Sequence, residues 1–111
     1  MGSSSLDVRS GIFMKRHPSI APVHPGEILR EDVFPALQMT KPALADALGI
    51  SRQTLHELFT LKRGVTPEMA MRLEMVLGST AETWLALQAE RDLWQVRKSP
   101  KMKGLKRLKA A

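Results

Sequence analysis

Cysteine is absent from this chain of 111 residues, and aromatic residues make up only 5% of it, against 43% hydrophobic residues in all. The lack of cysteine excludes disulfides and thiolate metal sites, and nothing argues for secretion. No apolar run approaches the roughly 20 residues that a membrane span needs. The length allows one domain with a modest core of Leu, Ala and Met. We expect the protein to be cytoplasmic and to have no membrane partner.

Acidic residues are missing from the end of the chain. Residues 97–111 hold seven Lys and Arg and no acid, whereas residues 15–96 hold nine bases and ten acids, so the net charge of +6 belongs to the tail. We therefore expect a folded domain over 15–96 and a basic, disordered tail over 97–111. Residues 1–14 have the character of a flexible leader or an expression remnant, with Met14 a candidate natural start.

Helix-start and helix-stop residues divide the domain into five expected helices. Pro25 is a first helical residue, Thr40, Ser51 and Thr66 are N-caps, and Ser79 has capping-box spacing to a glutamate. Pro35 is expected to end or kink the first helix near Phe34, while Gly49 and Gly78 end the second and fourth. Apolar residues recur at helical intervals along each segment, and they are Ile28, Leu29, Val33, Leu37, Leu44, Ala45, Leu48, Leu55, Leu58, Phe59, Ala70, Leu73, Val76, Leu77, Trp84, Leu85, Ala89 and Leu93. Those of the third and fourth helices are expected to face inward. No segment alternates as a strand does, so the prediction is an all-α fold.

The stretch KPALADALGISRQTLHEL, from Lys41 to Leu58, has the residue types of a helix-turn-helix. Where the two helices cross closely, the motif needs a small residue, and Ala45 supplies it. Four residues later the turn needs a glycine, which is Gly49, and then an apolar residue, which is Ile50. Any helix–glycine–helix corner in a bundle could show part of this pattern, so the outer face of the second helix has to decide.

That outer face carries hydrogen-bonding side chains at the helix N-terminus, the end that enters the major groove in such motifs. Arg can bond guanine through two hydrogen bonds and Gln can bond adenine. Free N–H groups at the helix start also favour a nearby phosphate. The expected DNA-contacting residues are Ser51, Arg52, Gln53, Thr54 and His56, with Lys62 and Arg63 as phosphate contacts in the following loop. A solvated helix and a solvated loop are the alternatives.

The sequence gives little support to a catalytic or a metal-binding function. The histidines, His17, His24 and His56, have no metal-ligand spacing, and no nucleophile–base set, carboxylate pair or phosphate-binding glycine loop occurs in a plausible frame. We expect no enzyme activity, no metal and no cofactor.

At HPGEILREDVFPAL, His24 to Leu37, the sequence resembles the HigA (VapI-like) antitoxins, a branch of the lambda-repressor-like, XRE-type helix-turn-helix proteins. Further matches are LADALGISRQTLHEL and LKRGVTPEMAMRLEMVLGSTAETWLALQ, so the resemblance covers roughly residues 24–94. It implies a five-helix domain, a homodimer, double-stranded operator DNA and repression of the protein's own operon. It also implies neutralisation of a HigB-type toxin, a RelE-like mRNA endonuclease.

Position by position, the resemblance places Arg52, Gln53, Thr54 and His56 on the recognition helix and Lys62 and Arg63 in the phosphate-contacting loop. It places the dimer interface on the fifth helix, through Trp84, Leu87, Gln88 and Arg91, and Trp94 is a further candidate. Core packing is the alternative for Trp84.

Two features depart from the family pattern. Leu61 stands where relatives usually have Gly, so a strained or differently turned loop is expected. The basic tail has no fixed counterpart; DNA phosphates are its favoured partner, ahead of an acidic patch on a toxin or an anionic membrane, and a solvated end without a role is the alternative.

Two other functions stay open from the sequence. One is a solitary XRE-type repressor without a toxin. The other is a protein-interaction module whose DNA binding has decayed, against which the intact polar face from Arg52 to His56 argues.

Overall fold

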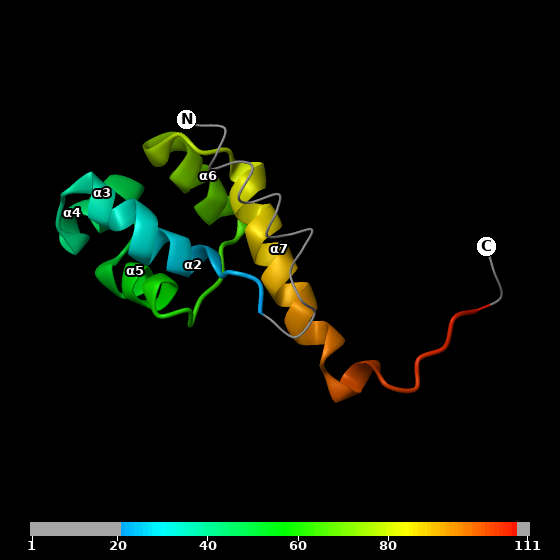
Figure 1. The fold of residues 1–111 in the computed structure, drawn as a ribbon. Coiled ribbons are helices and arrows are strands. Elements are labelled where there is room, and N and C mark those ends of the chain that lie inside the picture. Colours follow the sequence, from blue (N-terminus) through cyan, green and yellow to red (C-terminus); the bar gives the residue numbers. More distant parts are fainter. Residues whose placement is uncertain (1–20, 109–111) are drawn as a thin grey trace.

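Five helical segments build the part of the chain that the computed structural model describes, residues 21–108 (Figure 1). The first runs from α2 (Pro25–Ile28) through a π-helical turn (Leu29–Val33) into α3 (Phe34–Leu37). It is followed by α4 (Lys41–Leu48), α5 (Arg52–Phe59), α6 (Pro67–Leu77) and α7 (Ala81–Arg97), and then by a 3₁₀ turn (Pro100–Met102). No strand occurs among these residues, which confirms the all-α prediction. The predicted leader, residues 1–14, lies outside the described residues.

The expected break at Pro35 takes the form of a widened turn. The backbone N–H of Phe34 donates to the carbonyl of Leu29, five residues back, immediately before a proline that has no N–H to donate. The helix therefore does not end near Phe34. It continues to Leu37 and closes at Gln38, whose φ of 52° is left-handed.

Side-chain caps set the helix starts, as predicted for Thr40, Ser51 and Thr66. The prediction of Ser79 as the cap of α7 is wrong by one residue: the hydroxyl of Thr80 accepts from the N–H of Thr83 at 3.2 Å. A contact from α6 favours this start, because the Glu74 carboxylate accepts from the N–H of Ala81, the first residue of α7, at 2.7 Å.

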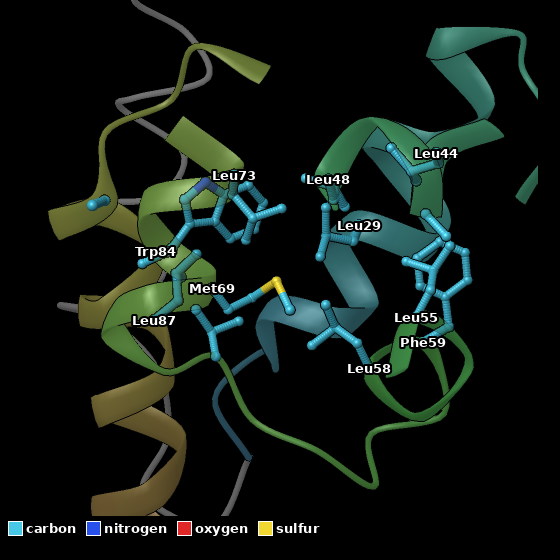
Figure 2. Packing of buried hydrophobic residues seen from close by; sticks show 14 residues of the cluster. Leu29, Leu44, Leu48, Leu55, Leu58, Phe59, Met69, Leu73, Trp84 and Leu87 are labelled. Carbon is cyan, nitrogen blue, oxygen red and sulfur yellow. The ribbon is translucent and has the colours of Figure 1, made fainter. Parts of the chain in front are cut away.

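The core lies where the first helix meets α4 and α5 on one side and α6 and α7 on the other (Figure 2). Leu29 is completely buried at this junction, and Leu44, Leu55, Leu58 and Leu73 are also almost fully buried. Val76, which was predicted to face inward, is exposed instead, and so are three other residues of the predicted apolar stripes: Leu37, Ala89 and Leu93. Within residues 21–108, the second half of α7 extends past the other helices, and these leave its apolar side exposed there (Figure 1).

The basic tail leaves α7 and points away from the helices, and residues 101–108 are all exposed (Figure 1). Within residues 21–108, every helix is too short or too polar to cross a lipid bilayer.

Candidate nucleic-acid interface

The turn between α4 and α5 closes through backbone hydrogen bonds that its sequence predicts. The N–H of Gly49 donates to Asp46 at 3.1 Å, and the N–H of Ile50 donates to Ala45 at 3.0 Å. This arrangement puts Gly49 at a φ of 70°, where a side chain would be strained. Ala45 is 1% exposed at the crossing, so a larger residue has no room there. The pair of helices is thus a helix-turn-helix with the predicted register.

Two arginines from outside the motif cap its helix ends. The Arg72 guanidinium, from α6, donates to the carbonyl of Leu48 at 2.9 Å and to that of Gly49 at 3.2 Å. Arg30, from the first helix, donates to the carbonyl of Phe59 at 2.7 Å, at the end of α5. Both α4 and α5 therefore end on a positive charge, which suits the negative end of a helix. Sequence reasoning missed both, because the partners lie 24 and 29 residues apart and leave no local pattern.

The outer face of α5 presents the predicted side chains to solvent. Arg52, Gln53 and His56 are exposed, and Thr54 is partly exposed. Ser51 is occupied as the N-cap: its hydroxyl oxygen accepts from the N–H of Thr54 at 3.0 Å. The two hydroxyls of Ser51 and Thr54 lie 2.9 Å apart, with Ser51 as donor, so Thr54 keeps its own O–H to donate outward.

The loop after α5 carries Lys62 and Arg63, the two predicted phosphate contacts. Lys62 is exposed, whereas Arg63 is paired with Glu57 of α5 through Nη2 at 2.6 Å and Nε at 3.0 Å. Glu57 also accepts from Gln53 Nε2 at 3.1 Å. The hydrogen bonds from Gln53 and Arg63 hold the pKa of the Glu57 carboxyl below its usual value. Glu57 was not among the predicted site residues, although its i,i+4 spacing from Gln53 was visible in the sequence.

Leu61 confirms the expectation of a strained loop. Its φ is 65°, in the left-handed region. The N–H of Leu61 donates to the carbonyl of Leu58 at 3.3 Å, and the N–H of Lys62 donates to the carbonyl of Glu57 at 2.9 Å. These two bonds form the helix-ending motif that normally has glycine at this position. The same motif ends α4 at Gly49, so two equivalent turns carry different residues.

The predicted dimer residues divide into two groups. Trp84, Leu87 and Gln88 are buried within the protomer and offer little surface for a second copy. Gln88 instead holds the loop after α5, since its Oε1 accepts from the N–H of Val65 at 2.8 Å while its Nε2 donates to Asp92 at 3.0 Å. A Cβ at Gly64 would lie 2.9 Å from the same amide, so the loop passes close to α7.

Arg91 and Trp94 of α7 are partly exposed. Arg91 donates to the carbonyl of Pro22 at 3.0 Å, which ties the segment before α2 to α7. The Lys98 ammonium lies 3.9 Å from the centre of the Trp94 ring, a cation–π distance.

Metal ligands do not gather in the part of the chain that the structure describes, where no group of three His, Asp or Glu side chains could hold an ion. His24 and His56 have different environments. His24 is buried as the N-cap of α2, with Nδ1 accepting from the N–H of Gly26 at 2.9 Å, whereas His56 is exposed on α5. His17 lies outside the described residues.

The fold and the exposed polar face of α5 define a helix-turn-helix protein of the DNA-binding class, and residues 36–85 match the helix-turn-helix family. More narrowly, the chain belongs to the HigA (VapI-like) antitoxin family of XRE-type helix-turn-helix proteins, as its sequence resemblance indicated. This family is a group of DNA-binding proteins, not a class of enzymes.

Three comparisons support the assignment. Antitoxin HigA-1 of Vibrio cholerae is 39% identical over 77 residues, 68% of this chain and 71% of its own length. Virulence-associated protein I of Dichelobacter nodosus is 39% identical over 71 residues, 64% of this chain and 66%, just under two thirds, of its own length. The solved structure of antitoxin GraA in complex with its operator is 36% identical, has a TM-score of 0.73, and covers 82% of this chain and 95% of GraA.

Proposed function

We propose that this protein is the antitoxin of a type II toxin–antitoxin pair. In this proposal it binds operator DNA as a homodimer, represses its own operon in the cytoplasm and neutralises a HigB-type, RelE-like mRNA endonuclease. The observation that carries the DNA-binding part is the polar face of α5, where Arg52, Gln53 and His56 stand exposed and uncovered by the rest of residues 21–108. A relative with the same fold, GraA, is known in complex with its operator.

Each side chain on this face has a role that its chemistry allows. Arg52 can bond the O6 and N7 atoms of guanine, and Gln53 can bond the N6 and N7 atoms of adenine. Thr54 and His56 add single hydrogen bonds, with the Thr54 hydroxyl free to donate. Lys62, Arg63 and the N–H groups at Ser51 suit phosphates, which fix the position of the helix without reading sequence.

A homodimer is proposed because one helix-turn-helix contacts few base pairs, so useful affinity needs two half-sites about one helical turn apart. The exposed apolar residues of α7 support it: Ala89, Leu93 and Val96 recur at helical intervals on one side, with Leu93 and Val96 48% and 46% exposed. Arg91 and Trp94 also stay in the proposed interface, although they lie on a different side of α7 from this stripe and Arg91 is bonded to Pro22.

Two assays test the proposal. Binding of the DNA duplex immediately upstream of the protein's own coding sequence should exceed binding of a scrambled duplex of equal composition. Co-expression with the product of a neighbouring RelE-like reading frame should yield a co-purifying complex and relieve growth arrest. If the duplexes bind equally, the repressor function fails. If DNA binds selectively but no neighbouring product is bound, the antitoxin function fails.

The second candidate function is a solitary XRE-type repressor. One observation favours it: a relative named as an HTH-type transcriptional regulator, YbaQ of Escherichia coli, is 39% identical to this chain over 75 residues. Selective DNA binding without a toxin partner in the second assay is the result that this candidate expects.

A further inference from the structure

Glu57 joins two predicted DNA contacts that come from different parts of the chain. One carboxylate oxygen accepts from Gln53 Nε2 at 3.1 Å, on the same helix. The other accepts from Nη2 and Nε of Arg63, in the loop, at 2.6 and 3.0 Å. The Glu57 side chain is 27% exposed and that of Arg63 47% exposed, so this chain of hydrogen bonds is open to solvent and includes two of the proposed DNA contacts.

The charge of Glu57 decides which way the Gln53 amide can point. A glutamate carboxyl at its usual pKa is ionised at neutral pH, and an ionised carboxylate only accepts hydrogen bonds. The amide must therefore turn its NH₂ group, and not its oxygen, toward Glu57. A flipped amide would place two acceptors against each other and lose the bond.

This orientation leaves Gln53 ready to read one base. Its Nε2 has a second hydrogen, and its Oε1 is free, so a donor and an acceptor stand side by side. Adenine offers the complementary pair in the major groove, an N7 acceptor beside an N6 donor. A glutamine that can rotate freely would meet other base edges nearly as well, and discrimination would fall.

Glu57 acts on Arg63 in a second way. The ion pair uses Nε and one Nη group of the guanidinium, which leaves Nη1 to donate to a phosphate. The carboxylate also offsets the charge of Arg63 and repels the phosphate backbone. Both effects weaken attraction that does not depend on sequence, which is the main source of non-specific binding.

We propose that Glu57 is a specificity-determining positioning residue of the DNA-binding face: it fixes the Gln53 amide for base reading and restrains Arg63 against non-specific phosphate binding. The inference rests on the proposed operator binding. Glu57 itself need touch no base, so its effect should pass through Gln53 for specificity and through Arg63 and charge for non-specific affinity.

The test measures binding of the upstream duplex and of the scrambled duplex by the full chain and its variants at one fixed salt concentration. Glu57→Gln should bind scrambled DNA severalfold more tightly and lower the upstream-to-scrambled affinity ratio about tenfold. In a Gln53→Ala background, Glu57→Gln should leave that ratio unchanged while still tightening scrambled binding. Glu82→Gln, at an exposed acid on α7, removes the same charge away from this face and should change both affinities by the same factor.

Two results overturn the inference. One is an unchanged ratio for Glu57→Gln while the wild-type protein discriminates between the duplexes. The other is an equal fall of the ratio with and without Gln53, because Glu57 then acts by another route. Wild-type protein that binds both duplexes equally contradicts the operator-binding function itself, and the inference with it. Thermal unfolding of each variant is the control that checks whether its fold is intact.

Discussion

Arg72 donates a hydrogen bond from Nη1 to the carbonyl oxygen of Leu48 at 2.9 Å, and this bond fastens the end of α4 to α6. The same guanidinium pairs with Glu68 at 2.8 Å, one helical turn earlier on α6. Because α5 begins only a few residues after Leu48, the position of the recognition helix depends on where α4 ends. Arg72 thus fixes the turn that precedes α5 to α6.

Removal of this cap should loosen the motif. Arg72→Ala leaves the last carbonyls of α4 without their charged donor, and we expect a loss of about 1–2 kcal/mol in the free energy of unfolding. Glu68→Gln is the matched control, since it weakens the exposed ion pair and keeps the bond to Leu48. Urea unfolding measures both. Equal stability of Arg72→Ala and the wild type would show that solvent caps α4 just as well.

Leu61 gives a prediction that separates backbone strain from side-chain packing. Leu61→Ala and Leu61→Gly both remove the side chain, but only glycine relieves the φ of 65°. We expect the glycine variant to be more stable than the alanine variant by about 1 kcal/mol, the cost of a left-handed conformation for an L-residue. Thermal unfolding of the two variants side by side gives the difference. An alanine variant as stable as the glycine variant would contradict the strain at this turn.

His24 makes stability depend on pH. Its burial, with the nearby charge of Arg91, holds the pKa of His24 below its usual 6.5, and its Nδ1 must stay unprotonated to accept from Gly26. Because the folded state binds this proton more weakly than the unfolded state, the contribution to stability is complete above about pH 6.5 and is lost as the pH falls through the lower, folded-state pKa.

The measurement is the melting temperature at about pH 7.5 and about pH 5, for the wild type and for His24→Asn. Asparagine keeps a side-chain acceptor for the N-cap and cannot titrate. The wild type should lose more stability on acidification than the variant does. Parallel losses in the two proteins would assign the pH dependence to other groups.

How far the sequence predicted this molecule depended on whether the cause was local. Caps such as Thr40 and Thr66 and the turn at Gly49 were correctly predicted, since each acts within a few residues. Contacts between distant segments were not predictable: Arg72 on Leu48, Arg30 on Phe59, and Gln88 on the backbone of Val65. The expectation that Val76 faces inward failed because helical spacing identifies an apolar face but not what covers it.

The basic tail gives a prediction about salt. A chain that ends after Ser99 keeps the contact of Lys98 with Trp94 and removes the exposed bases that follow, among them Lys101, Lys103 and Arg107. If the tail binds phosphates, truncation lowers the affinity for every duplex and flattens the dependence of log K on log salt, by about 0.9 for each phosphate that the tail neutralises. The upstream-to-scrambled ratio stays the same. An unchanged salt slope would remove DNA as the partner of the tail and point to a toxin or to no role.

If the exposed N-terminal face of α5 reads DNA sequence, its side chains set the affinity ratio between the upstream and scrambled duplexes. Arg52→Ala and Gln53→Ala should each weaken upstream binding by about 1–3 kcal/mol and lower the ratio, because each removes a bond to a base edge. Lys62→Ala should weaken both duplexes by the same factor, because a phosphate contact carries no sequence information. If Arg52→Ala and Gln53→Ala both leave the ratio at its wild-type value, α5 is not the recognition helix.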